Sequence, residues 1–186
     1  MPLMSNVRPQ NMQVRLLTAK DTSRYRELML EAYVEAPDAF TTTAEERALE
    51  PDSWWVNRIA NPNGLSVSFG AEIEQHLVGT VALEYASKPK TKHSALLIGM
   101  YVREQARGQG VGWSLLGAAL SHAARRHGVR VITLTVTEGN APAIGLYQEA
   151  GFQAWGTQPL AIATPSGLKG KVHMSYPLAG HVQTAA

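Results

Sequence analysis

One segment of the chain, residues 93–136, limits the folds open to it more than any other. The segment begins with an apolar run (93–102), passes through a glycine-rich turn, and continues as a helical pattern (108–127) that Gly128 closes. A second apolar run (131–136) follows. Two neighbouring strands joined by a crossover helix lie parallel in one sheet, whereas a tight hairpin makes its strands antiparallel. The segment therefore predicts a strand–helix–strand unit with a parallel strand pair.

The other patterns predict antiparallel strands and short helices. Two hairpins are expected, 65–74 with 77–85 and 152–163 with 171–178, together with a first strand over 13–18. Helices are expected over 21–35, over 44–60 with a break near Pro51, and over 141–150. The predicted fold class is α/β (α+β): one domain over 13–179 with a mixed, mostly antiparallel central sheet of about seven strands flanked by helices. Residues 1–12 and 180–186 are expected to be flexible tails.

Composition excludes several classes of protein. A net charge of +2 with scattered basic residues does not favour nucleic acid as a partner, and the longest apolar runs, such as 115–120, are too short for a membrane span. The chain has no cysteine, so disulfides and thiol nucleophiles are excluded, and a reducing cytoplasmic location is expected. No metal-ligand cluster is present, so no metal is expected. A homodimer is compatible with these features.

The glycine-rich turn is a candidate anion site. Glycines between a strand and a helix let the backbone approach a ligand, and the first N–H groups of the helix have no partner of their own. A dinucleotide fingerprint starting at Gly108 would need glycine where Trp113 stands, and a Walker A loop would need a lysine that 103–127 lacks. Two interpretations remain open: a cradle for a pyrophosphate, and a turn that only packs the helix on the sheet.

Two motifs in this segment and after it resemble those of one family. Gln105-x-x-Gly108-x-Gly110, preceded by Met100-Tyr101-Val102, is similar to the acetyl-CoA-binding motif of the GNAT superfamily of N-acetyltransferases. Asn140-x-x-Ala143-x-x-Leu146-Tyr147-x-x-x-Gly151-Phe152, downstream of the second strand, resembles the next motif of that superfamily. The resemblance covers about residues 13–178. It implies the acyl-CoA N-acyltransferase fold, acetyl-CoA as co-substrate and an amine of unknown identity as acceptor.

The resemblance also implies where the cofactor binds. The parallel strands would separate around the pantetheine arm, with Gly99 providing the bulge that opens the gap. The glycine turn would hold the pyrophosphate, and Tyr147 would act as general acid toward the leaving thiolate. The implied cofactor-binding residues are Met100, Tyr101, Val102, Gln105, Arg107, Gly108, Gln109, Gly110, Val111, Gly112, Asn140, Ala143 and Tyr147.

Several of these residues could instead have an ordinary structural role. Arg107 could be a solvated arginine, Asn140 could serve only as a helix N-cap, and Tyr147 could be a core residue. The general base is also open, because the strand 93–102 lacks the glutamate that many family members carry there. Glu84 is the candidate chosen here, and His93, Glu138, His173 and a chain of water molecules are its alternatives.

The acceptor side gives fewer clues. Phe40, Trp54 and Trp55 lie near four acidic residues, Glu45, Glu46, Glu50 and Asp52, and such a set could bind a cationic amine. The alternative is a core tryptophan beside a solvated acidic helix face. The acceptor could be a small molecule or a protein amine. The alternative function is a non-catalytic acyl-CoA-binding regulatory domain of the same fold.

Overall fold

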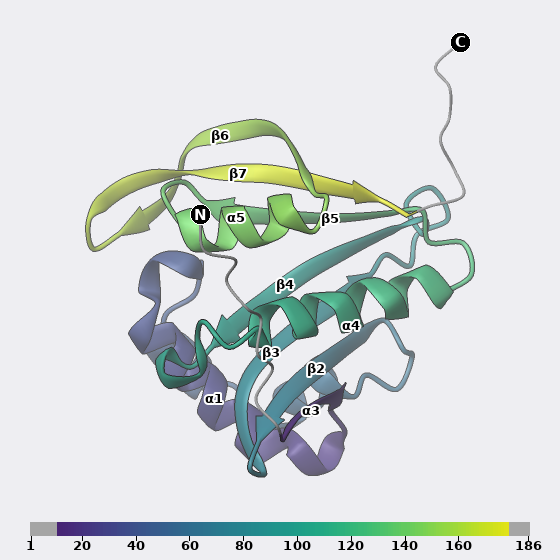
Figure 1. Ribbon diagram of the computed structural model, residues 1–186, viewed down its shortest axis with the longest axis vertical. Coiled ribbons are helices and arrows are strands. Elements are labelled where there is room, and N and C mark those ends of the chain that lie inside the picture. The colour runs from purple at the N-terminus through teal and green to yellow at the C-terminus, as the bar shows by residue number, and fades with distance from the viewer. Residues whose placement is uncertain (1–10, 179–186) are drawn as a thin grey trace.

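The computed structural model describes residues 11–178. They form a single seven-stranded sheet with five α-helices around it (Figure 1). The strands are β1 (Met12–Leu16), β2 (Ser66–Ile73), β3 (His76–Tyr85), β4 (Ser94–Val102), β5 (Val131–Thr137), β6 (Gln153–Thr164) and β7 (Gly167–Pro177). The helices are α1 (Thr22–Glu35), α2 (Ala44–Ala48), α3 (Asp52–Ile59), α4 (Val111–Arg125) and α5 (Ala141–Glu149). Of the expected tails 1–12 and 180–186, residues 1–10 and 180–186 lie outside the described residues.

The strand order confirms the fold class predicted from the sequence. The sheet runs β1-β2-β3-β4-β5-β7-β6, and every neighbouring pair except one is antiparallel. The exception is β4 with β5, the two strands that α4 connects. Their pairing is short: it joins Ser94 to Val131, Ala95 to Ile132 and Leu96 to Thr133, and no further pair follows. The two strands therefore run together at one end of the sheet only.

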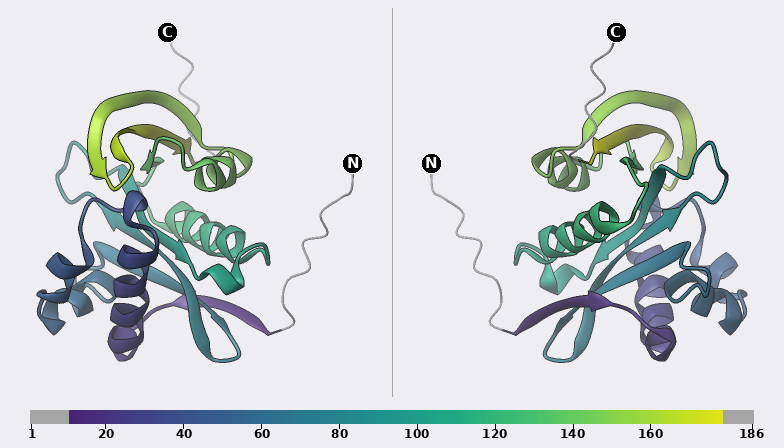
Figure 2. Two further views of the ribbon diagram at one scale, coloured as in Figure 1. Left: turned by 90° about the vertical axis from the view of Figure 1, so that its left-hand side faces the viewer. Right: turned by 90° about the vertical axis from the view of Figure 1, so that its right-hand side faces the viewer.

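Helices cover both faces of the sheet. Figure 2 shows α1, α2 and α3 on one side and α4 and α5 on the other. The α4 side contains the larger core, in which Leu115, Leu116 and Ile132 are fully buried. The α1 side contains a second core around Leu28 and Trp55. The sheet is thus buried on both faces where β3 and β4 cross the middle of the molecule.

Local boundaries differ from the sequence prediction at three places. The first hairpin turns at Glu74-Gln75, because Ile73 pairs with His76, so the expected turn at 75–76 is wrong by one residue. Met12 already belongs to β1. The second hairpin turns at Pro165-Ser166, so β7 begins earlier than the expected residue 171. In each case the pairing partner across the sheet sets the boundary, which local sequence does not encode.

The start of α1 is held by ion pairs. Asp21 was expected to cap the helix, but its carboxylate accepts bonds from Arg15 at 2.8 and 2.9 Å and from the backbone N–H of Thr18 at 2.8 Å. The Asp21 side chain is 5% exposed. The Arg15 guanidinium is the main reason that the pKa of Asp21 lies well below its usual value of 3.8. This carboxylate is therefore charged in the native state throughout the ordinary pH range.

Asp21→Asn is expected to lower the free energy of unfolding at pH 7 by about 2–4 kcal/mol, because it removes a buried charged partner of two arginines. A carboxyl with a depressed native pKa stabilises the fold fully above its unfolded pKa, and this contribution is lost as the pH falls below about 4. Urea titrations of both proteins at several pH values measure the effect. A difference that stayed constant down to pH 2 would contradict this assignment.

Candidate active site

The gap between β4 and β5 originates at a β-bulge in β4. Thr80 pairs with Tyr101 and Ala82 pairs with Ile98, so Gly99 and Met100 together lie opposite the single residue Val81. Gly99 has a φ of +62°, a left-handed conformation that favours glycine. The bulge was expected from the glycine, and it bends β4 just beyond its last pair with β5. The strands consequently separate, as the family resemblance implied.

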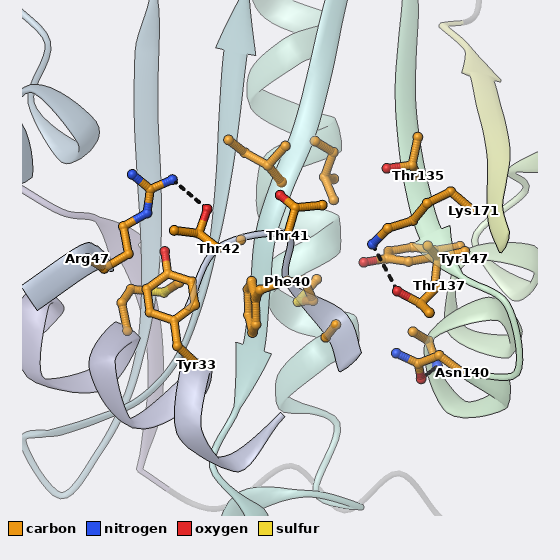
Figure 3. A pocket seen from close by; sticks show the side chains of 18 of the residues that line it. Tyr33, Phe40, Thr41, Thr42, Arg47, Thr135, Thr137, Asn140, Tyr147 and Lys171 are labelled. Atoms are coloured by element: carbon orange, nitrogen blue, oxygen red, sulfur yellow. Dashed lines mark hydrogen bonds between the residues drawn. The ribbon is translucent and has the colours of Figure 1, made fainter. Parts of the chain in front are cut away.

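A cavity of about 220 Å³ lies at this gap. It is lined by residues of β4, β5, α5 and β7 and, across the gap, by α1 and the segment leading into α2 (Figure 3). The lining residues with polar side chains are Tyr33, Thr41, Thr42, Arg47, Arg58, Thr135, Thr137, Asn140, Tyr147 and Lys171. Three of these are cationic, and none of the described lining residues is Asp, Glu or His.

Tyr147 presents its hydroxyl to this cavity. Figure 3 shows its hydroxyl directed toward the gap, and its ring packs edge-on against Phe152 with ring centroids 5.7 Å apart. The residue is 6% exposed, and burial raises the pKa of its phenol to about 12. The hydroxyl therefore keeps its proton at neutral pH and can donate it to a group inside the cavity.

The first turn of α5 is built by Asn140. The Asn140 side chain accepts a hydrogen bond from the backbone N–H of Ala143 at 3.3 Å, and Pro142 occupies the first turn. Asn140 therefore is an N-cap, and it also lines the cavity together with Ala143. Ala143 and Tyr147 are four residues apart and share a helix face.

The glycine turn leads into α4 with an open backbone. Gly108 and Gly110 have φ values of +72° and +75°, and a Cβ added at either would meet no protein atom within 4 Å. Gly110 is the N-cap of α4, so the N–H groups of Val111 and Gly112 begin the helix without an intrahelical acceptor. Neighbouring side chains fold back onto the turn: Arg107 Nε donates to the carbonyl of Val102, and Gln109 donates to that of Gln105, both at 2.9 Å.

Some residues of the first motif face away from the gap. Tyr101 is 5% exposed, packs with the α1 core and donates its hydroxyl to Glu31 at 3.2 Å. The side chain of Val111 is 1% exposed in the other core. A Cβ on Gly112 would stand 3.3 Å from Leu146, so this glycine brings α4 close to α5. At these three positions only the backbone is available to a ligand.

The four candidate bases lie outside the cavity lining. Glu84 makes an ion pair with Arg58, whose side chain does line the cavity. Glu138 accepts a hydrogen bond from the backbone N–H of Gly170 at 3.3 Å. His173 stacks on Trp155, with ring centroids 5.0 Å apart, and His93 is exposed just before β4. The choice among them stays a prediction.

The acceptor side differs from the expected cage of aromatic and acidic residues. Phe40 lines the cavity, but Trp55 is fully buried in the α1 core. Trp54 lies under Arg47 and Arg58, at 4.4 and 5.6 Å from their guanidinium carbons. Of the four acids, only Glu50 approaches this cluster, at 3.4 Å from Arg47, and none lines the cavity. The three cations Arg47, Arg58 and Lys171 have no local signal in the sequence, because they come together only through tertiary packing.

Comparison with known proteins identifies the family of the chain. Residues 25–152 match the model of the Acetyltransferase (GNAT) family. The curated relatives include the L-methionine sulfoximine/L-methionine sulfone acetyltransferases of Pseudomonas aeruginosa and Pseudomonas paraeruginosa, each 42% identical over 60 residues. That match spans 32% of this chain and 34% of each relative, about a third of their length.

Solved structures extend the likeness to nearly the whole chain. A GCN5-related N-acetyltransferase from Kribbella flavida is 29% identical with a TM-score of 0.77, covering 91% of this chain and 99% of that one. The Salmonella typhimurium acetyltransferase yncA, solved with its cofactor acetyl-CoA, has a TM-score of 0.76 at 20% identity and covers 95% and 99%. The chain belongs to the GNAT acetyltransferase family. The family match supports an acetyltransferase activity.

Among residues 11–178, no helix combines the length and apolar character that a membrane span requires.

Proposed function

We propose that this enzyme acetylates a small primary amine in the cavity between β4, β5 and the segment before α2, with Tyr147 as general acid. One observation carries the proposal: the Tyr147 hydroxyl enters the same cavity that the Gly99 bulge opens beside β4. A volume of about 220 Å³ is small for a ligand site, so it suits an acetyl group with a compact acceptor. The methionine derivatives named for the Pseudomonas relatives also carry a primary amine.

The residues of the two motifs fit acetyl-CoA. The edge of β4 beyond Leu96 has no strand partner on the β5 side, so an extended pantetheine arm can lie along it as an added strand would. The open turn at Gly108 and Gly110 and the first N–H groups of α4 suit a pyrophosphate, and the helix dipole adds favourable potential. We infer that Arg107 and Gln109 support this turn, because both bond to its carbonyl groups.

Tyr147 is the proposed donor to the departing sulfur. Acetyl-CoA provides an acetyl group activated as a thioester, and a neutral amine displaces the thiol from it. The side chain of Tyr147 holds its proton until negative charge develops on the sulfur. A thiol near pKa ~8.5 is a stronger acid than a phenol near 12, so the tyrosine acts chiefly by donating a hydrogen bond. The rate enhancement that Tyr147 can provide is therefore moderate.

The amine must lose a proton before it attacks, since an ordinary primary amine is mostly protonated at neutral pH. Because the described lining contains no carboxylate or imidazole, we propose that water carries this proton out of the cavity. Glu84 is the candidate that receives it, and it can do so only after its ion pair with Arg58 loosens.

Acetyl-CoA at 100 times its dissociation constant is expected to stabilise the folded protein by about 2.7 kcal/mol, because it binds the native state only. For a chain of this size that corresponds to a rise in Tm of roughly 5–10 °C. NAD and ATP, measured at the same concentration by thermal denaturation, should raise the Tm much less, since neither has a pantetheine arm. Equal shifts with all three ligands would rule out the proposed cofactor site.

A further inference from the structure

We propose that the amine acceptor also carries a carboxylate, and that Lys171 binds this group beside the reacting amine. The inference rests on the proposed function of the cavity and names the chemical class of its second substrate. It begins from the environment of one buried lysine.

Lys171 has no acidic partner among residues 11–178. Its side chain projects from β7 into the cavity, the residue is 8% exposed, and its ammonium donates to the hydroxyl of Thr137 at 2.8 Å. The Thr137 hydroxyl in turn donates to the carbonyl of Asp38 at 2.5 Å. The two acids on neighbouring elements are engaged elsewhere: Asp38 with Lys169 at 2.7 Å, and Glu138 with a backbone N–H. The lysine is thus held by a neutral group only.

The buried ammonium of Lys171 therefore lacks a counterion among the described residues. An ammonium has three N–H groups, and burying one without a compensating anion is unfavourable. Burial lowers the pKa of Lys171, which is the expected sign for a cation without a partner. A carboxylate arriving with the acceptor would accept the remaining N–H bonds and supply the missing negative charge.

The charges around the whole cavity also favour an anionic group on the acceptor. Arg58 is neutralised by Glu84, and Arg47 lies against Trp54 with Glu50 at 3.4 Å. Lys171 is the remaining cation of the lining among the described residues, and no carboxylate of the protein lines the cavity to attract a second positive charge. The cavity therefore favours an acceptor that carries a negatively charged group in addition to its amine.

The position of Lys171 limits where the carboxylate can sit on the acceptor. Lys171 and Tyr147 line the same end of the cavity, where β5, β7 and α5 meet (Figure 3). Tyr147 marks the place where the sulfur departs and the amine attacks. A carboxylate bound by Lys171 is therefore close to the amine in the same molecule, which is the arrangement in an α-amino acid.

Matched acceptors test the proposal directly. The twenty common amino acids and their carboxamides are compared by release of free thiol from acetyl-CoA with the full chain. The expected result is that at least one amino acid has a kcat/KM about 10- to 100-fold above that of its carboxamide, the usual effect of a charge-assisted hydrogen bond. Without recognition of the carboxylate, the carboxamide would react faster, because its amine is less basic and is therefore more often unprotonated. If every carboxamide has a kcat/KM equal to that of its amino acid, the proposal is wrong. The proposed N-acetyl transfer would still stand.

Two lysine variants separate recognition from catalysis. Lys171→Met should raise KM for the acid and reduce the preference for acid over carboxamide about 10-fold or more. Lys169→Met, two residues away on the same strand and paired with Asp38, is the matched control and should retain the preference. If Lys171→Met instead lowers kcat equally for acid and carboxamide, the lysine acts on the reaction itself as base or oxyanion donor, and the proposal is wrong.

A binding measurement gives a second readout that needs no turnover. The CoA-saturated protein is titrated with N-acetyl amino acids and with their N-acetyl carboxamides, and the Tm is recorded. At least one free acid should raise the Tm of the wild-type and Lys169→Met proteins, but not of Lys171→Met, while its carboxamide should not. If no acid in the panel stabilises the wild type more than its carboxamide, the proposed carboxylate site does not exist.

Discussion

Tyr147→Phe is expected to lower kcat about 100-fold while the KM for acetyl-CoA changes little. The substitution removes only the hydroxyl, and the ring keeps its contact with Phe152. A positioned acid contributes about 10²–10⁴-fold, and the lower end applies because a thiolate already leaves readily. Steady-state kinetics with a substrate whose chemical step limits the rate measure the effect.

The matched control for this variant is Tyr85→Phe. Tyr85 is also buried, its pKa is also raised to about 12, and its hydroxyl has no hydrogen-bond partner among the described residues. It lies outside the cavity lining, so Tyr85→Phe is expected to retain full turnover. Full activity in Tyr147→Phe would assign Tyr147 to packing and leave the acid unidentified. A loss of CoA affinity alongside activity would show a structural role for the hydroxyl.

The pH dependence of the same variant gives an independent check. A phenol with a pKa of about 12 does not titrate between pH 6 and 10, so wild type and Tyr147→Phe should share one profile shape. Activity should rise with pH in both proteins because the acceptor amine loses its proton.

Gly110→Val is expected to weaken CoA binding about 100-fold, a loss of about 2.7 kcal/mol, the size of one or two charged hydrogen bonds. The position is open toward solvent and has a φ of +75°, so a branched side chain would occupy the approach to the first N–H groups of α4. Isothermal titration with CoA measures the affinity directly.

Valine at a left-handed position also strains the backbone, by about 1–2 kcal/mol, so this variant needs a control of equal strain. Gly128→Val provides it: Gly128 has a φ of +86°, and an added Cβ there also meets no protein atom within 4 Å. Both variants should lose similar stability in urea, and only Gly110→Val should lose CoA affinity. Unchanged affinity in a folded Gly110→Val protein would place the pyrophosphate elsewhere.

The sequence predicts the fold of the half of the molecule that carries both motifs, the proposed cofactor side, because its signals are local. The strand–turn–helix–strand unit, the bulge glycine Gly99 and the two motifs are each contiguous, and their backbone geometry follows from residue types at short spacing. The hairpin turn at Glu74-Gln75 was placed one residue late because its two positive φ angles fall on non-glycine residues. Nothing in their composition signals that conformation.

The acceptor half could not be predicted in the same way. Arg47 and Arg58 lie eleven positions apart in sequence on two helices, and both lie over the ring of Trp54 where they line the cavity. Lys171 is a single charged residue in a strand, and its burial results from pairing with Thr137 across β5 and β7. The acids that suggested a cationic acceptor instead lie outside the cavity lining, mostly on exposed positions of α2 and α3.

The short pairing of β4 with β5 divides the sheet into two half-sheets, β1–β4 and β5–β7–β6, that share a seam of three residue pairs. If acetyl-CoA binds in the gap beyond that seam, as proposed, it touches both half-sheets and adds cohesion between them. Binding of this kind shifts the folding equilibrium by mass action. Since degradation in cells draws on the unfolded fraction, the lifetime of the protein would then depend on the supply of acetyl-CoA.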